Sequence, residues 1–261
     1  MTFADLYHSG LLYCLREHFS SAWQTVLFVL AFLLVLSAAY LLGSLNFGII
    51  ISTKKYGTDV RTLGSGNAGS TNMLRNFGKK AAALTFLGDT LKAVAAVIIG
   101  RLLLGETGAY ISGLFCILGH LFPCYFRFKG GKGVATAAAM ILIIDPVIFA
   151  AVIVMFLLVL LITRYVSLSS IMAAFIYPAV MYFRYQLSGT YPPTLSFVCA
   201  ITIAFLIIIM HRENIKRLFR GREPKLVLRK KNRLTPEEFE KEAKKRYDDE
   251  VYVDYDENDK K

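Results

Sequence analysis

Charge is scarce in this sequence of 261 residues: 19% of the residues are Asp, Glu, Lys or Arg, whereas 55% are apolar. Soluble globular domains carry about 25% charged residues and about 45–50% apolar residues. This composition excludes an ordinary soluble domain. The mean hydropathy of +0.49 instead indicates a chain that lies largely in a lipid bilayer.

Metal-ligand patterns are also lacking. The sequence has no Cys-x-x-Cys pair, and its few histidines are not spaced as ligands. We interpret the cysteines as buried free thiols, and we expect no metal and no cofactor. The N-terminus lacks a basic segment, and no small-residue cleavage site follows the first apolar run, so we expect that run to remain as an anchor. The residues concerned are Cys14, Cys116, Cys124, Cys199, His8, His18, His120 and His211.

Long apolar runs dominate what is present. A helix needs about 20 apolar residues to cross a bilayer. One run, 133–144, is too short to cross unaided, so we expect a half-helix or part of a tight hairpin that turns at Asp145 and Pro146. The candidate spans are 24–53, 81–104, 108–126, 133–144, 146–163, 166–184 and 194–210.

The distribution of Lys and Arg predicts the topology. Residues 54–80, 127–132 and 212–233 hold six, three and ten basic residues, whereas residues 1–23 hold one. The positive-inside rule places these three segments in the cytoplasm and the N-terminus outside. An even number of crossings must separate the last two segments, which requires the short run to be counted. We therefore predict an all-α polytopic membrane protein with seven transmembrane helices, a short fourth helix and a cytoplasmic C-terminus.

The charge balance divides the chain into three parts. Residues 234–261 hold 11 acidic and 6 basic residues, a net charge of −5. The net charge of the whole chain is +11, so residues 1–233 carry a net charge of +16. Basic membrane loops favour anionic headgroups or anionic substrates over nucleic acid. We predict an extracytoplasmic extension at 1–23, a seven-span domain at 24–223 and a charged cytoplasmic tail at 224–261. The tail, with a helix capped by Thr235, is either a solvated appendage or a docking site for a partner.

Three polar clusters interrupt the apolar runs, and all fall in predicted cytoplasmic segments. The first, at 60–80, combines glycines, hydroxyl and amide side chains and arginines, a composition that lets backbone N–H groups converge on an anion. A flexible linker would have a similar composition. The candidate anion-binding residues here are Ser65, Gly66, Asn67, Gly69, Thr71, Asn72 and Arg75.

The second cluster is GHLFPCYFRFKGGKGVAT at 119–136. It is not a nucleotide P-loop, because Phe126 stands where that motif needs its first glycine. Lys132 nonetheless adds a positive charge directly before the short predicted helix, whose N-terminus favours anions. A positive-inside signal alone would explain the lysines but not the glycines. The expected backbone donors are those of Gly130, Gly131 and Gly133.

The third cluster is HRENIKRLFRGRE at 211–223, directly after the last predicted span. On a continuing helix, His211 and Asn214 would share one face, with Arg217 near them. Basic residues at this position are also ordinary headgroup anchors. A His–Asn pair at the membrane boundary is less ordinary, so we expect it to contribute to a site.

In this order, GSGNAGSTNMLR, GHLFPCYFRFKGGKGVAT and HRENIKRLFRGRE closely resemble the three signature motifs of the bacterial glycerol-3-phosphate acyltransferase family that uses acyl phosphate. The resemblance covers about residues 30–223. The sequence departs from the family pattern at Asn46, where proline is expected, and at Ala93, where glycine is expected. Both departures lie outside the three motifs.

The resemblance implies transfer of an acyl group from acyl phosphate to the 1-hydroxyl of glycerol 3-phosphate. The products would be lysophosphatidic acid and inorganic phosphate, the first acylation step of phospholipid synthesis. It implies a multi-pass protein of the bacterial cytoplasmic membrane with its site on the cytoplasmic side. The expected partners are these two substrates and membrane lipids, without nucleic acid, and the oligomeric state stays open.

The resemblance also implies roles for individual residues. Arg75 and Lys132 would supply charge to phosphate, while His211 and Asn214 would orient glycerol 3-phosphate. Either His211 or a substrate phosphate oxygen would take the proton of the hydroxyl. The family's substrate contacts map onto Ser65, Arg75, Lys132, His211 and Asn214, with Ser167, Ser170 and Arg217 as further candidates.

Two absences fit an acyl-phosphate donor. No Asp follows any histidine by five residues, and no Gly-x-Ser-x-Gly elbow is present. A mixed anhydride has a good leaving group and needs no covalent intermediate.

Two alternative functions stay open: a transporter for a phosphorylated solute and a catalytically silent scaffold. Asp89 and Lys92 form either a structural pair or part of a site, and His120 serves either packing or the site.

Overall fold

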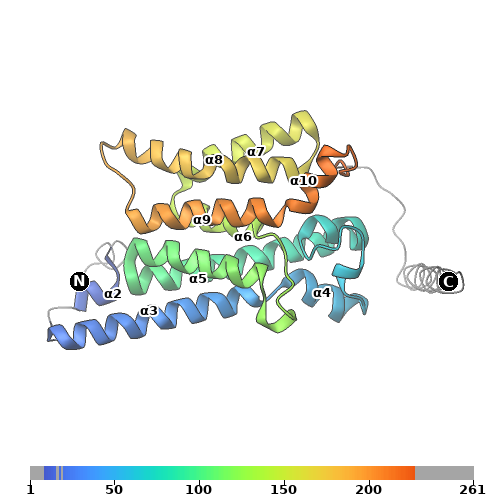
Figure 1. Ribbon diagram of the computed structural model, residues 1–261. Helices are drawn as coiled ribbons and strands as arrows, with labels where there is room; N and C mark the ends of the chain where they lie inside the picture. Colours follow the sequence, from blue (N-terminus) through green and yellow to red (C-terminus); the bar gives the residue numbers. More distant parts are fainter. Residues whose placement is uncertain (1–8, 16–17, 19, 227–261) are drawn as a thin grey trace, which may run out of the picture. The chain divides into compact units, whose positions relative to one another are not determined.

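The structure is a computed structural model that describes residues 9–15, 18 and 20–226. Within these residues every regular element is a helix, as the predicted all-α class requires. The helices pack side by side (Figure 1), and the largest cluster of buried apolar side chains lies among α5 to α9. The predicted tail helix that begins at Thr235 lies outside the described residues. The four cysteines are free, and Cys116 and Cys199 are buried.

The first apolar run is broken where one span was predicted over 24–53. A short helix, α2 (Leu11–Leu15), precedes α3 (Ser21–Ser44), and α4 (Phe47–Tyr56) follows after two residues. Asn46 caps α4, because its side-chain oxygen accepts a hydrogen bond from the Ile49 backbone N–H at 3.3 Å. Asn46 thus starts α4 at the position where the resemblance led us to expect proline.

The next element, α5 (Ser70–Leu121), contains two of the predicted spans and folds back on itself. Gly78 and Gly105 both adopt positive φ, 83° and 67°, and interrupt the helix. Beyond Gly105 the chain runs antiparallel, since Lys92 Nζ lies 2.9 Å from His120 Nδ1. The predicted spans 81–104 and 108–126 are therefore two arms of a hairpin, and the second arm ends earlier than predicted.

The remaining helices follow the predicted runs closely. Asp145 separates α6 from α7, because its carboxylate accepts hydrogen bonds from the first N–H groups of α7 and Pro146 occupies the first helical position. The short run is thus a separate helix of 11 residues. Two 3₁₀ turns, η2 (Val60–Thr62) and η3 (Cys124–Phe126), lie in the loops. The helices are α6 (Val134–Ile144), α7 (Pro146–Thr163), α8 (Val166–Leu187), α9 (Thr194–Met210) and α10 (Arg212–Phe219).

The chain bends by 54° between α9 and α10, at His211, so the continuing helix predicted across this boundary is not found. The bend turns α10 away from the axis of α9. Asn214 stays buried nonetheless, with 6% of its surface exposed.

By length and composition, four helices of the described chain can cross a membrane, or five if the bent α9–α10 pair counts as one span. The outward faces are apolar: Leu161 and Ile162 of α7 are 77% and 81% exposed. Helices that turn large apolar side chains outward in this way suit a hydrocarbon solvent. The chain is therefore an integral membrane protein, whereas the count of seven crossings stays a prediction.

Candidate active site

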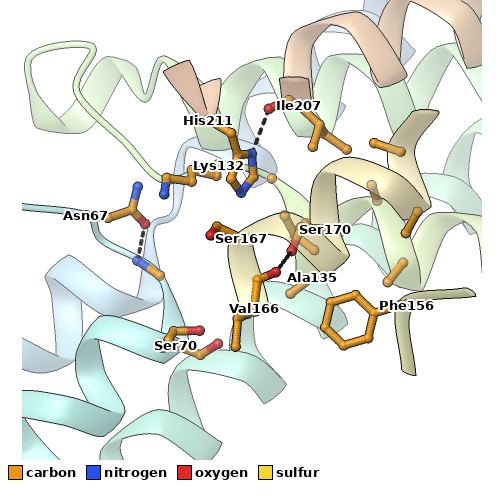
Figure 2. Close-up of a pocket in the computed structure, with 18 of the residues that line it drawn as sticks. Asn67, Ser70, Lys132, Ala135, Phe156, Val166, Ser167, Ser170, Ile207 and His211 are labelled. Carbon is orange, nitrogen blue, oxygen red and sulfur yellow. Dashed lines mark hydrogen bonds between the residues drawn. The ribbon is translucent and has the colours of Figure 1, made fainter. Parts of the chain in front are cut away.

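A cavity of about 350 Å³ lies among the loop at 63–69 and helices α5 to α10. Its size is typical of small-molecule sites. One end is polar, with Asn67, Ser70, Lys132 and His211 projecting toward the same space, and Phe156 marks the apolar side (Figure 2). The apolar lining includes Ala137, Ala138, Ile141, Phe149, Val152, Ile153, Ala173, Ala174, Tyr177, Ile203, Ala204 and Ile207.

A chain of polar contacts connects the second and third sequence clusters at the polar end. Lys132 Nζ donates to Asn214 Oδ1. Asn214 Nδ2 in turn donates to Glu223 Oε1 at 2.6 Å, and Arg217 Nε donates to Glu223 Oε2 at 2.8 Å. Arg75 reaches the same region, where its guanidinium donates to the Pro224 carbonyl at 3.4 Å. Cationic groups from three elements therefore converge at this end.

Burial shapes the ionisation of two of these groups. Burial, opposed by Glu223 and aided by the arginines, lowers the pKa of Lys132 to about 8. Burial and the nearby Lys132 charge lower the pKa of His211 to about 4. At neutral pH the cavity thus holds a charged lysine and an uncharged histidine.

The His211 tautomer follows from one contact. Its Nδ1 lies 2.8 Å from the Ile207 carbonyl oxygen. A carbonyl oxygen only accepts hydrogen bonds, so Nδ1 carries the proton of the neutral ring. Nε2 is left with a lone pair, and the residue lines the cavity. His211 therefore offers the cavity a hydrogen-bond acceptor.

Comparison with known proteins decides the family. Residues 33–221 match the sequence profile described as Glycerol-3-phosphate acyltransferase. The chain belongs to this family. Relatives named glycerol-3-phosphate acyltransferase from Clostridioides difficile (strain 630) and Alkaliphilus metalliredigens (strain QYMF) are 38% and 41% identical over 204 and 194 residues. These alignments cover 76% and 74% of this chain and 97% and 95% of the relatives.

Solved structures agree with the family assignment. The crystal structure of an integral membrane glycerol 3-phosphate acyltransferase in its glycerol 3-phosphate form matches with a TM-score of 0.68 at 39% identity. That match covers 75% of this chain and 96% of the other. The lysophosphatidic acid form matches with a TM-score of 0.66 at 38% identity. Family membership, predicted from the three motifs, is confirmed.

Most of the predicted site residues of this family member line the cavity. They are Ser65, Asn67, Gly69, Thr71, Asn72, Arg75, Lys132, Gly133, Ser167, Ser170, His211 and Asn214. The lining does not include Gly66, Gly130, Gly131 and Arg217. Glu223 lines the cavity and was not predicted, although an acidic residue in the otherwise basic stretch after Asn214 was a visible signal.

Asn72 organises the first loop from within. Its amide nitrogen donates to the carbonyls of Val60, Leu63 and Asn67 at 2.9–3.0 Å. Its oxygen accepts from the Ser65 backbone N–H at 3.2 Å. Both ends of the amide are therefore engaged with the loop, so Asn72 shapes this turn and has little capacity left for a ligand.

The glycines of the second loop have a different role from the predicted one. The N–H groups of Gly130 and Gly131 donate to the carbonyls of Leu121 and His120, each at 3.1 Å, and so satisfy the C-terminal end of α5. A Cβ on Gly131 would overlap the His120 ring. These two glycines permit close approach of the loop to α5, while Gly133 and the N-terminus of α6 face the cavity.

Arg61 connects the two loops. Its guanidinium donates to the carbonyls of Phe126 and Lys129 at 2.9 and 2.6 Å. Asp59 holds the same guanidinium through both carboxylate oxygens. The first and second clusters are thereby fixed relative to each other, which sets the geometry of the polar end before any ligand arrives.

Proposed function

We propose that this protein transfers an acyl group from acyl phosphate to the 1-hydroxyl of glycerol 3-phosphate, giving lysophosphatidic acid and inorganic phosphate. The observation that carries the proposal is a single cavity with a cationic end and an apolar end. Both substrates carry phosphate, and the donor carries a hydrocarbon chain. The related solved structures are named for glycerol 3-phosphate and lysophosphatidic acid forms, which supports the acceptor and the product.

In the proposed reaction, the acceptor hydroxyl oxygen attacks the carbonyl carbon of the acyl phosphate and a new C–O ester bond forms. The bond from that carbon to the bridging phosphate oxygen breaks, and its electron pair leaves with phosphate. Arg75, Lys132 and the N-terminus of α6 stabilise the leaving charge. Ser65, Asn67 and the other cavity-lining residues of the first loop hold phosphate oxygens. Positioning the two substrates contributes about 7–11 kcal/mol.

His211 orients the attacking hydroxyl in this proposal. Its unprotonated Nε2 accepts the hydroxyl hydrogen bond, and Asn214 fixes the acceptor beside it. A histidine with a pKa of about 4 is a weak base at neutral pH. A substrate phosphate, with a second pKa of about 6, is the better final proton acceptor. Ser167 and Ser170 extend the polar wall, although the Ser170 hydroxyl also donates to the Val166 carbonyl at 2.8 Å.

We further propose seven membrane crossings, with the two arms of α5 and the short α6 counted separately. The N-terminus lies outside the bacterial cytoplasmic membrane, and the basic loops with the polar end of the cavity lie in the cytoplasm. Residues 1–23 form the external extension and 224–261 the cytoplasmic tail. This arrangement gives the charged substrates access from the cytoplasm and the acyl chain access from the bilayer.

The test is phosphate release by the purified protein, given palmitoyl phosphate with and without glycerol 3-phosphate. We expect release that depends on glycerol 3-phosphate, with an equal amount of lysophosphatidic acid. Transfer only from acyl-CoA or acyl-carrier protein would keep the transferase and overturn the donor. No transfer from any donor, with uptake of a phosphorylated solute by vesicles containing the protein, would replace the enzyme by a transporter.

The pH dependence offers a second prediction. Lys132 must be charged to bind phosphate, and its pKa of about 8 means that the charged form is lost as pH rises through that value. We expect kcat/KM to fall on the alkaline side of about pH 8. Lys132→Arg should retain activity at pH 9 relative to pH 7, because a guanidinium stays charged. If kcat/KM of Lys132→Arg fell at alkaline pH as it does in the wild type, the fall would be caused by a group other than Lys132.

A further inference from the structure

A buried polar network contributes Asp89 and His120 to the cavity wall. Lys92 Nζ contacts Asp89 Oδ1 at 2.8 Å and His120 Nδ1 at 2.9 Å. Its three N–H groups are shared between these two side chains and the carbonyls of Gly43 and Leu45, at 2.9 and 2.7 Å, where α3 ends. His120 is 4% exposed and Asp89 is 2% exposed, yet both line the cavity.

The contact with Lys92 fixes which nitrogen of His120 carries the proton. An ammonium group only donates hydrogen bonds, so Nδ1 at 2.9 Å accepts with its lone pair. The proton of the neutral ring then sits on Nε2. The Asp89 oxygen is farther from Nδ1, at 3.5 Å, which agrees with Lys92 as the partner. This pairing also means that Asp89 and His120 do not form an acid–base dyad, because Nε2 has no free lone pair.

His120 lines the cavity, and its Nε2–H group is the ring donor that the Lys92 contact leaves free. It has no hydrogen-bond partner among the described residues and is not fully enclosed by protein. It lies against Gly131, one residue before Lys132. A nearly buried, unpaired donor beside a phosphate-binding lysine is costly unless something accepts from it.

We propose that His120 is a substrate-binding residue whose Nε2–H donates a hydrogen bond to an oxygen of the bound phosphorylated substrate. Lys92 and Asp89 are positioning residues that hold the ring in the donor tautomer. The inference rests on the proposed function. It gives the cavity two histidines of opposite character: His120 donates through Nε2, and His211 accepts through Nε2. A donor suits a phosphate or carbonyl oxygen, and an acceptor suits a hydroxyl.

Two substitutions separate this role from a structural one. His120→Asn places an amide oxygen near the Nδ1 position and keeps the acceptor for Lys92, but it removes the donor at Nε2. His120→Gln places an amide nitrogen near Nε2 and restores that donor, but it removes the acceptor for Lys92. We expect His120→Asn to lower kcat/KM by about 10- to 100-fold, the range for a hydrogen bond to a charged group, and His120→Gln to stay within about threefold.

The reverse order, with His120→Gln more damaging than His120→Asn, would show that only the Lys92 contact matters and would overturn the proposal. Separate KM values for acyl phosphate and glycerol 3-phosphate identify which substrate supplies the oxygen. We expect similar thermal unfolding temperatures for both variants in detergent. If the variant with the lower kcat/KM also unfolded at a lower temperature, its loss of activity would indicate a folding effect.

A measurement without turnover distinguishes failure of this inference from failure of the proposed function. Nitrogen-15 spectra of the histidine rings in the detergent-solubilised protein should show His120 protonated at Nε2, with a shift on addition of glycerol 3-phosphate or palmitoyl phosphate. Protonation at Nδ1, or no shift with either compound, would overturn the assignment. A wild-type protein inactive with every acyl donor would instead contradict the proposed function.

Discussion

Replacing Lys132 by alanine is expected to lower turnover of acyl phosphate by at least about 100- to 1,000-fold, the usual cost of removing one group that stabilises developing charge. Lys132 is the cation at the N-terminus of α6, and it also donates to Asn214. In the proposed reaction, its loss removes a positive charge from the bound phosphate and a hydrogen-bond partner from Asn214, which fixes the acceptor. Steady-state kinetics with palmitoyl phosphate and glycerol 3-phosphate provide the measurement.

Lys129→Ala is the matched control. Lys129 lies three residues earlier in the same loop, is exposed and does not line the cavity. The two variants change the net charge of the loop equally, so a difference between them reports the location of the charge. We expect Lys129→Ala to retain nearly full activity. A well-folded Lys132→Ala protein with wild-type turnover would remove the second loop from the proposed mechanism.

Hydropathy predicts the helices well where the apolar runs are uninterrupted. The runs 146–163 and 194–210 coincide with α7 and α9, because polar or proline residues mark their ends in sequence. The break between α3 and α4 was missed, because it spans only Leu45 and Asn46, and one polar residue is too few to end an apolar run in sequence. The bend at His211 was missed because nothing local distinguishes a bent from a straight continuation there.

The site shows a similar division. Polar or charged side chains that line the cavity, such as Lys132 and His211, were predicted from the motifs. Glu223 was missed because its importance depends on contacts with Asn214 and Arg217 that only the bend and turn after α9 create. His120 was left open because its tautomer depends on Lys92, which is 28 residues away and meets it only when α5 reverses at Gly105. Such pairings arise from tertiary structure, which residue spacing does not encode.

His211→Asn is expected to lower kcat by about 100-fold, the lower range for a group that assists proton transfer. The asparagine amide can still donate to the Ile207 carbonyl, as Nδ1 does in the wild type. It lacks an atom at the Nε2 position, so the attacking hydroxyl loses its acceptor while the local fold is retained. His211→Gln places an oxygen near Nε2 and should recover most of the lost rate.

The pH profiles of these variants separate two routes for the proton. A pKa of about 4 keeps wild-type His211 neutral above about pH 5, so titration of this residue should produce no change in rate between pH 6 and pH 8. If glutamine, which cannot take up a proton in this range, restores the rate, then His211 orients the hydroxyl and a substrate phosphate takes the proton. If glutamine is as inactive as asparagine, the imidazole itself must accept the proton, and orientation alone is insufficient.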